Sequence, residues 1–364
     1  MDRETLKVWG QSILLLVVLY VFLVSIGLLG ASFKLFGKDL AIQLIEMTSN
    51  PLVGLFAGIL ATTLAQSSST TTSIAVGMVG GGALTIEGAI PVIMGANIGT
   101  SVTNTLVSMG HITRREEFRR ALAGATVHDF FNLLVVAILL PIEIAFGYLR
   151  TVGEFVSAAF AGIGGLKAAS PLKLATEPMV KQLLALLDQS PVLGVVLALV
   201  LMYVALKFLV DLAKGLVVQR SERFIHRYLF GAPLATMLFG VIMTVLVQSS
   251  SSTTSMVIPL IGAGVLTLEQ VFPYTLGANV GTTVTAMLAA LATGNIAAVT
   301  VAFAHLIFNV TGILLIYPLR VVRAIPLRLA RGLAELTSRS RVYAFVYVGA
   351  VFYLIPFLLI LAWR

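Results

Sequence analysis

The chain has 364 residues, of which 58% are hydrophobic and only 11% are charged. Soluble domains carry about 25% charged residues, so this composition predicts a chain that is buried in a lipid bilayer. The lack of cysteine excludes disulfide scaffolds, thiolate metal sites and cysteine nucleophiles, and four histidines leave few ligands for zinc or haem. The net charge of +8 suggests an anionic partner only if the cations cluster, and their positions instead follow the order of the apolar segments.

Seven uncharged segments are long enough to cross a bilayer, which takes about 20 predominantly apolar residues per helix. They are residues 8–33, 88–113, 121–141, 189–206, 270–294, 296–319 and 342–363. The first is not followed by a small-residue cleavage site and a soluble stretch, so we expect a retained helix rather than a signal peptide. The segments predict an all-α, multi-pass membrane protein of the inner or plasma membrane of a cell.

Two longer uncharged segments, residues 47–86 and 228–268, each carry a polar cluster at the midpoint. Gln66 begins the cluster Gln-Ser-Ser-Ser-Thr-Thr-Thr-Ser, and Gln248 begins the cluster Gln-Ser-Ser-Ser-Ser-Thr-Thr-Ser. The arm that follows each cluster is only about 20 Å long as a helix, which is short of the ~30 Å hydrocarbon core. Both segments are therefore predicted to be re-entrant helical hairpins whose tips end near mid-membrane, where protein or a wet cavity satisfies the backbone.

The placement of charge favours a cytoplasmic N-terminus. In that orientation the predicted cytoplasmic loops, residues 114–120, 214–227 and 320–341, carry net charges of +2, +3 and +5. The predicted outer segments, residues 34–46 and 143–188, each sum to zero. This positive-inside bias explains the basic charge without a nucleic acid, and the sequence has no basic patch interleaved with aromatic residues.

The sequence contains an internal repeat with an offset of 182 residues. This offset relates Gln66 to Gln248, and it relates Asn97 to Asn279 within the segments Gly-Ala-Asn-Ile-Gly-Thr and Gly-Ala-Asn-Val-Gly-Thr. Three full spans separate the two hairpins, so the two copies are predicted to enter the membrane from opposite faces. Inverted repeats of this kind are typical of secondary transporters, which bind substrate at the midplane where broken helices meet.

Each Gly-Ala-Asn segment follows a proline inside an apolar span, Pro91 in the first copy and Pro273 in the second. Proline removes a donor and kinks a helix, paired glycines loosen the turn, and Asn and Thr supply oxygen ligands. We expect a discontinuous helix that faces the hairpin tip in each copy.

The predicted hairpin tips offer amide and hydroxyl groups and no charged side chain. The N-terminus of each second arm points its unsatisfied N–H groups and its positive dipole end at the tip, which suits a small oxyanion. The C-terminal carbonyls of the first arms, with Gln, Ser and Thr oxygens, suit a small hard cation. This inventory predicts a site for an anion together with sodium.

Each of these features has an alternative interpretation. A Ser/Thr run in a membrane helix can bond back to its own carbonyls, and glycines 80–82 can serve close helix packing. His128 and Asp129 near a serine cluster suggest a hydrolase, but the looser repeat His305-Leu-Ile-Phe-Asn lacks the acid and the sequence has no Gly-x-Ser-x-Gly elbow. We interpret both histidines as donors in helix packing. Asp129 is a candidate functional acid, unless an arginine pairs with it.

Four segments together resemble the type II sodium-phosphate cotransporter family. They are Gln66-Ser-Ser-Ser, Gln248-Ser-Ser-Ser, Asn97-Ile-Gly-Thr-Ser-Val-Thr-Asn-Thr and Phe118-Arg-Arg-Ala-Leu-Ala-Gly-Ala-Thr-Val-His-Asp. The resemblance covers residues 51–141 and 234–318. It implies a symporter, not an enzyme, that imports inorganic phosphate with sodium by alternating access, in which a transport domain of hairpins and broken helices moves against a scaffold.

The resemblance also implies site residues, carried over by motif. Phosphate would be held by Ser67, Ser68, Ser69, Ser249, Ser250, Ser251, Asn97 and Asn279. The sodium site would comprise Gln66, Thr100, Gln248, Ser249, Thr282 and Thr285. Sodium ions are the co-transported species, and the lipid bilayer is the further partner. No organic cofactor and no nucleic acid is implied, and the oligomeric state is left open.

The chain departs from the family pattern in two places. The outer segment 150–189 lacks the cysteines of the vertebrate members, and residues 108–113 lack the extra acid of the electrogenic members. Because neutral donors do not by themselves distinguish small oxyanions, a sodium-coupled carrier of sulfate or a dicarboxylate stays open. A passive anion channel and an intramembrane serine hydrolase are further alternatives.

We expect five parts along the chain. These are an N-terminal transmembrane helix and connector (1–46), repeat 1 with hairpin, broken helix and transmembrane helix (47–147), an outer segment with a scaffold helix (148–227), inverted repeat 2 (228–320), and a basic cytoplasmic loop with the C-terminal transmembrane helix (321–364).

Overall fold

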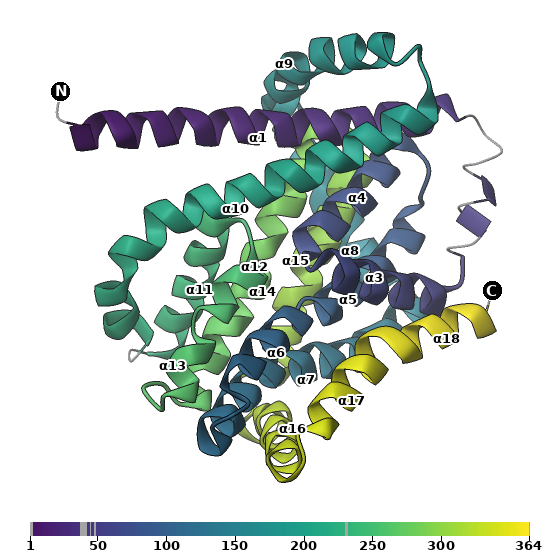
Figure 1. The fold of residues 1–364 in the computed structure, drawn as a ribbon. Coiled ribbons are helices and arrows are strands. Elements are labelled where there is room, and N and C mark those ends of the chain that lie inside the picture. Colours follow the sequence, from purple (N-terminus) through teal and green to yellow (C-terminus); the bar gives the residue numbers. More distant parts are fainter. Residues whose placement is uncertain (1–2, 37–41, 44, 47–48, 230–231, 364) are drawn as a thin grey trace.

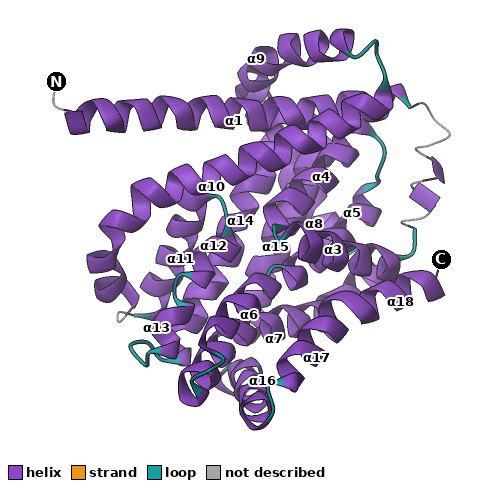
Figure 2. Ribbon diagram, in the orientation of Figure 1, coloured by secondary structure: helices purple, strands orange, loops and turns teal. Residues whose placement is uncertain are grey.

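The computed structural model describes the chain except for residues 1–2, 37–41, 44, 47–48, 230–231 and 364. The described residues form helices joined by turns, and none of them lies in a β-strand (Figures 1 and 2). The predicted all-α architecture is confirmed. Part of the connector predicted at residues 34–46 lies outside the described residues.

Six helices in the described chain are long and apolar enough to cross a membrane: Ile13–Leu35, Arg115–Phe146, Pro191–Leu212, Leu268–Thr293, Ile296–Ile316 and Val342–Ala362. They correspond to six of the seven predicted spans. The remaining span, residues 88–113, is divided into α5 (Ile86–Gly99), α6 (Val102–Ser108) and the short 3₁₀ helix η1 (Met109–His111). This division agrees with the discontinuous helix that was predicted for the first Gly-Ala-Asn segment.

Three segments that were predicted as loops are helical. Residues 214–227 continue α10 (Pro191–Leu229), and residues 320–341 are mostly α16 (Arg320–Arg339). Residues 114–120 form the start of α7 (Arg115–Phe146). Arg, Lys and Glu are good helix formers, so charge marks the end of an apolar span without marking the end of a helix.

The outer segment predicted at residues 143–188 is also largely helical. It contains α8 (Tyr148–Gly162) and α9 (Gly165–Leu186). In Figure 1, α9 lies at the opposite end of the molecule from α16, and the first helix, α1 (Arg3–Leu35), runs alongside α10. The chain ends in α17 (Val342–Gly349), the π-helical segment η2 (Ala350–Leu354) and α18 (Ile355–Ala362).

Both predicted hairpins are present as helix–turn–helix units. The first is α3 (Pro51–Ala65) with α4 (Ser68–Gly81), and the second is α11 (Pro233–Val247) with α12 (Ser250–Ser255) and α13 (Ile258–Gly262). The first arms have 15 residues each, or about 22 Å, which is too short for a full crossing. The break before α13 follows from Pro259, which has no N–H for the carbonyl of Ser255.

Each first arm packs closely on the helix that carries the Gly-Ala-Asn segment, α3 on α5 and α11 on α14 (Leu268–Thr293). A Cβ on Gly95 would collide with the carbonyl oxygen of Leu55, and a Cβ on Gly277 would collide with that of Met237. These glycines therefore allow two backbones to approach, as small residues do in membrane helix pairs. They were predicted to loosen the helix instead.

The predicted broken helix is present in the first copy and wrong in the second. The first copy breaks at Thr100 and Ser101, between α5 and α6, whereas α14 continues from Leu268 to Thr293. Downstream of the motif the first copy carries Asn, Thr, Ser and Gly, which favour turns, while the second is rich in Ala, the best helix former. Local propensity thus accounts for the difference.

Candidate functional site

Both hairpins turn at the same dipeptide with nearly the same backbone. Gln66 lies in the left-handed region at φ 51° and ψ 29°, and Gln248 lies there at φ 58° and ψ 23°. The next residues are extended, Ser67 at φ −152° and ψ 105° and Ser249 at φ −153° and ψ 109°. A left-handed residue ends one helix, and an extended serine can cap the next one. Two residues are therefore enough to reverse the chain.

The serine after each glutamine caps the second arm. Ser67 Oγ accepts the backbone N–H of Thr70 at 3.2 Å, and Ser249 Oγ accepts that of Ser252 at 3.2 Å. Capping satisfies the third N–H of the helix, whereas the first two have no acceptor inside it. Each tip therefore presents two open N–H groups beside serine hydroxyls.

The two tips lie against each other. Ser69 Oγ donates to the carbonyl oxygen of Gln248 at 3.3 Å. Ser251 Oγ donates to the carbonyl oxygen of Thr100, at the break between α5 and α6, at 3.4 Å. The tip of each hairpin thus contacts the other copy, and the predicted apposition of the two polar clusters is present.

The two tips differ in how their glutamines are held. Thr285 Oγ1 donates to Gln248 Oε1 at 2.9 Å, and Gln248 Nε2 donates to the carbonyl of Val245 at 2.5 Å. The corresponding residues of the first copy, Gln66 and Thr103, make no hydrogen bond to each other, and the buried Thr103 hydroxyl has no partner among the described residues. Sequence reasoning missed Thr103, although the 182-residue offset from Thr285 points to it.

Behind the first tip, Asn97 is held by two residues of α15 (Ile296–Ile316). Asn97 Nδ2 donates to Asn309 Oδ1 at 2.9 Å, and Asn97 Oδ1 lies 3.1 Å from Nε2 of His305. All three residues are at most 2% exposed. Because the amide oxygen can only accept, His305 is the donor through Nε2.

Behind the second tip, Asn279 is held in the same way by α7. Asn279 Nδ2 donates to Asn132 Oδ1 at 2.8 Å, and Asn279 Oδ1 lies 2.5 Å from Nε2 of His128. Asn132 also donates to the backbone carbonyl of Asn97 at 2.8 Å. The asparagine of each copy is therefore bonded by the His-x-x-x-Asn pair of the other copy.

These contacts agree with the interpretation of His128 and His305 as donors in helix packing. The ring of His128 bonds Asn279 and no serine, and its Nδ1 has no partner among the described residues. The geometry of a serine hydrolase, in which a histidine bonds the nucleophile, is therefore not formed there.

Asp129 is fully buried next to His128, and it has no arginine partner among the described residues. Its Oδ2 accepts the hydroxyl of Tyr347 at 2.9 Å, while Oδ1 has no hydrogen bond. The nearby arginines are engaged elsewhere, Arg119 with Glu116 and Arg120 with the carbonyl of Gly262. The alternative in which an arginine neutralises Asp129 is wrong.

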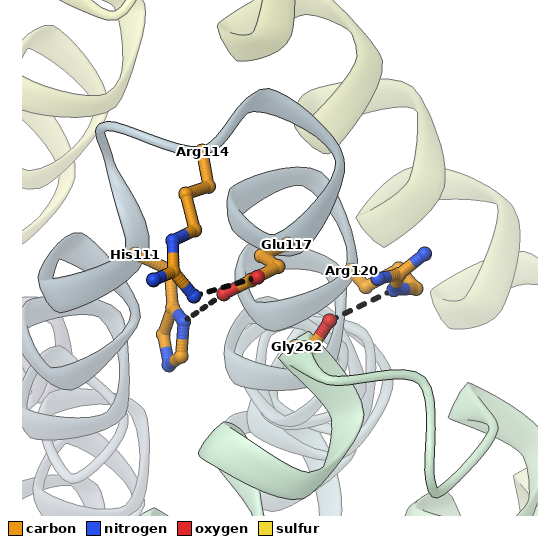
Figure 3. A network of polar contacts seen from close by, with 5 residues as sticks. All are labelled: His111, Arg114, Glu117, Arg120 and Gly262. Atoms are coloured by element: carbon orange, nitrogen blue, oxygen red, sulfur yellow. Dashed lines mark hydrogen bonds and ion pairs between the residues drawn. The ribbon is translucent and has the colours of Figure 1, made fainter.

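Figure 3 shows the polar end of α7, where the two copies are also joined. His111 and Arg114 both approach Glu117, at 3.2 and 2.9 Å, and Arg120 reaches the carbonyl of Gly262 in α13 at 2.9 Å. The bond from Arg120 joins the second arm of hairpin two to the first copy, whereas the contacts of Glu117 lie within the first copy.

Buried hydroxyls without a partner lie on the hairpins and on α6. Among the described residues they are Thr62, Thr63, Ser73, Thr103 and Thr244. Thr62 and Thr244 are equivalent by the 182-residue offset, and each lies one turn before its hairpin glutamine. Because buried polar groups nearly always have a hydrogen-bond partner, these hydroxyls indicate a site that takes water, ions or polar ligands.

The structure places the residues of the predicted phosphate set in different environments. Ser68 and Ser250 are each 2% exposed, and their hydroxyls bond no described residue. The amides of Asn97 and Asn279 are already engaged, as described above. At the first tip, the hydroxyl of Ser67 accepts bonds from Thr70, and its own O–H donates to no described residue. Ser67, Ser68 and Ser250 therefore keep free O–H donors at the tips.

The residues of the predicted sodium set also differ in what they contact. The hydroxyls of Thr100 and Thr282 bond back to the carbonyls of Ala96 and Ala278, at 2.9 and 3.1 Å. Such back-bonding leaves the lone pairs of the hydroxyl oxygen available to a cation.

Comparison with known proteins gives a consistent picture. The Na+/Pi-cotransporter family matches residues 21–169 and 201–317. The chain is 37% identical over 445 residues to sodium-dependent phosphate transport protein 2B of Homo sapiens, covering 95% of this chain and 64% of the relative. It is 38% identical over 422 residues to sodium-dependent phosphate transport protein 2A of Mus musculus, covering 94% and 66%.

The chain spans just under two thirds of the length of these relatives. No solved structure matches it significantly. Its apolar helices and its relatives show a multi-pass membrane protein. By the family match and the identity over most of its length, the chain belongs to the Na+/Pi-cotransporter family.

Proposed function

We propose that this protein imports inorganic phosphate across a cell membrane and that sodium ions, moving with the phosphate, drive the import. The observation that carries this proposal is the contact of two hairpin tips with nearly the same backbone turn, in which Ser69 of one bonds Gln248 of the other. The contact gathers open N–H groups, serine hydroxyls and carbonyl oxygens at one buried place. The names of the relatives, sodium-dependent phosphate transport proteins, support the choice of the two ions.

Phosphate would be bound by the serines of both tips, Ser67, Ser68, Ser69, Ser249, Ser250 and Ser251. The free hydroxyls of Ser68 and Ser250 and the unsatisfied N–H groups of each second arm are neutral donors, which suit an oxyanion. With no fixed cation beside it, the anion would be neutralised by the sodium that travels with it. Asn97 and Asn279 would support the site from behind, because their amides are engaged by His305 and His128.

Sodium would be bound by the oxygens at the ends of the first arms. The side chain of Gln248 lies next to Thr285, which donates to its oxygen, and Ser249 and Thr282 come from the adjoining turn and helix. Gln66 and Thr100 would complete the region in the first copy. Neutral carbonyl, amide and hydroxyl oxygens are ligands that hard cations prefer.

We further propose that the copies 47–147 and 228–320 are inverted repeats that move together as the transport domain. Equal turns, equal helix crossings and the exchanged His–Asn pairs support a two-fold relation between them. The ion pairs at the start of the two Gly-Ala-Asn helices also support this two-fold relation, because Glu87 pairs with Arg150 and the equivalent Glu269 pairs with Arg331. The bias of positive charge supports a cytoplasmic N-terminus.

Uptake of labelled phosphate into proteoliposomes tests the proposal. We expect accumulation driven by an inward sodium gradient and none when potassium replaces sodium. Uptake that is unchanged in potassium would reject the coupling. Competition by arsenate but not by sulfate or dicarboxylates would assign the anion, and downhill flux alone would indicate a channel.

Serine-to-alanine variants locate the anion in the same assay. Ser68→Ala and Ser250→Ala each remove a donor worth about 1 to 3 kcal/mol to a buried anion, so the apparent KM for phosphate should rise roughly 5- to 150-fold. Ser338→Ala, on α16 and away from the tips, is the control. Unchanged kinetics in both tip variants would remove the tips from the site.

A further inference from the structure

The helix α16 joins two helices that are each long and apolar enough to cross a membrane. It begins four residues after α15 ends at Ile316, and it ends three residues before the C-terminal span begins at Val342. Because the helices on both sides are long and apolar enough to cross a membrane, α16 is held where the lipid headgroups lie. Figure 1 shows it at one end of the molecule, and it packs against α7.

The residues of α16 divide into three faces. One face is buried against the protein and consists of Pro326, Leu327, Ala330, Ala334 and Thr337. A second face is apolar and exposed, and its residues recur every four positions: Val321 is 80% exposed, Ile325 38% and Leu329 47%. The third face carries arginines. A helix with this distribution is typical of one that lies in the interface of a bilayer.

A cavity of about 430 Å³ lies between α16 and the start of α14. Its charged lining consists of Arg320, Arg323, Arg328, Arg331 and Glu269. The spacing of the four arginines places them along one side of α16. Four cations against one carboxylate leave the cavity strongly positive.

Two of the four arginines are already partnered. Arg331 forms an ion pair with Glu269, and the guanidinium of Arg323 stacks over the ring of Tyr317 at 5.0 Å. Arg320 and Arg328 form neither an ion pair nor a hydrogen bond with any described residue. Guanidinium groups bind phosphate oxygens in pairs, so these two are available for a phosphate group.

The equivalent helix of the first copy shows that the fold does not require these arginines. It is α8, which follows α7 as α16 follows α15, and its Arg150 pairs with Glu87 as Arg331 pairs with Glu269. The other charged residue of α8 is Glu154, whereas α16 has five arginines and one glutamate. The extra cations of α16 therefore serve something besides packing.

We propose that this cavity binds the phosphate of an anionic phospholipid headgroup, with Arg320 and Arg328 as its ligands. Exposed apolar side chains border the cavity and would contact the acyl chains. Leu319 and Val321 flank Arg320 and are 58% and 80% exposed, and Leu234, next to the lining Pro233, is 68% exposed. A free phosphate ion has no acyl chain to contact these apolar side chains.

Native mass spectrometry of the full chain in detergent tests the proposal, with dioleoyl phosphatidylglycerol and dioleoyl phosphatidylcholine as probes. We expect phosphatidylglycerol to bind in preference, and the R320Q/R328Q variant to lose at least about tenfold in affinity, because charge-assisted bonds are lost. The matched control is R115Q/R341Q, which removes two arginines that also form no ion pair with a described residue and that lie outside this cavity.

Three results would overturn the proposal. Equal loss in both double variants would show diffuse attraction to a basic surface, and equal binding of the two lipids would show no preference for charge. Displacement of the lipid by inorganic phosphate at millimolar concentration would assign the cavity to the free ion. If the double variant fails to fold, the single variants R320Q and R328Q provide the same test.

Discussion

The first hairpin, α3–α4, and the second, α11–α12, turn through the same two residues with nearly identical dihedral angles, yet their surroundings differ. In the second copy Gln248 is bonded to Thr285, and the helix behind it is unbroken. In the first copy Gln66 and Thr103 are not bonded to each other, and the helix behind them is broken at Thr100.

This comparison shows that the duplication preserved the helix packing and the hairpin turns around the site, whereas the helix behind the tip is continuous in only one copy. The close helix crossing, the left-handed glutamine and the serine cap recur in both copies because each depends on a residue type that the duplication kept. The break depends on weak helix formers after the motif, which only the first copy has. The first tip therefore has more unpaired polar groups and less regular backbone to hold them.

The largest effect should come from the helix crossing, which the two copies share. Gly95→Ala and Gly277→Ala each place a Cβ against a backbone carbonyl, so we expect a loss of about 3 kcal/mol of stability or more in both. Thermal unfolding in detergent and the yield of folded protein measure it. Gly332→Ala, on α16 with nothing within 4 Å, is the control and should be neutral or stabilising. A large loss of stability in only one of the two variants would contradict the equivalence of the two helix crossings.

The hydrogen bonds between each histidine and the asparagine of the other copy should give a measurable interaction energy between the two copies. A double-mutant cycle of His128→Ala with Asn279→Ala should give an interaction energy of about 0.5 to 3 kcal/mol in thermal unfolding, because the two side chains share a buried hydrogen bond. The cycle of His128→Ala with Asn97→Ala joins residues without such a bond and should give a clearly smaller value. Equal values in the two cycles would contradict the exchange.

Substitutions next to the hairpin glutamines should have different effects on stability in the two copies. Thr285→Val breaks the bond to Gln248 and should cost about 1 kcal/mol of stability. Thr103→Val replaces a buried hydroxyl without a partner, so its effect should be near zero or favourable. The shift in unfolding midpoint of the two variants checks this, and equal shifts would mean that the asymmetry of the tips is wrong.

The smallest effect should come from Glu87 and Arg150, whose side chains are 57% and 39% exposed. Burial would raise the pKa of Glu87, but hydrogen bonds from the backbone, Arg150 and Thr85 outweigh it and lower the pKa below 4.5. Since the folded pKa is the lower one, the stabilisation is present above pH 4.5 and is lost as the pH falls through the folded pKa.

An exposed pair of this kind contributes about 0.2 to 1 kcal/mol. Glu87→Gln should therefore lower the unfolding midpoint slightly at pH 7, and the difference from the parent chain should shrink as the pH falls below 4.5. A difference that stays constant as the pH falls would show that the carboxylate charge is not responsible.

Much of the fold followed from the sequence, because apolar length and polar clusters are local properties. Six spans, both hairpins and the apposition of the two polar tips were predicted in this way. The unbroken α14 and the helical α16 were not, because they depend on helix propensity within segments that were judged by proline and charge.

The contacts behind the tips were predictable only in part. The repeat of His128 and His305 was visible, and their role as donors was inferred. Each histidine bonds the asparagine of the other copy, and this exchange depends on how α7 and α15 pack. The spacing of residues in the sequence does not predict that packing.

The most direct test uses the absence of native cysteine. The double variant S69C/Q248C, in membranes and in sodium, should form a cross-link that neither single variant forms, because the two residues are in contact. Because this double variant removes two proposed ion ligands, the ions are tested on the parent chain, whose unfolding midpoint should rise with sodium and phosphate together and should not rise with potassium and phosphate. A pair that never cross-links, or a parent chain whose unfolding midpoint is the same in all these ions, would contradict the account that two hairpin tips together enclose the transported ions.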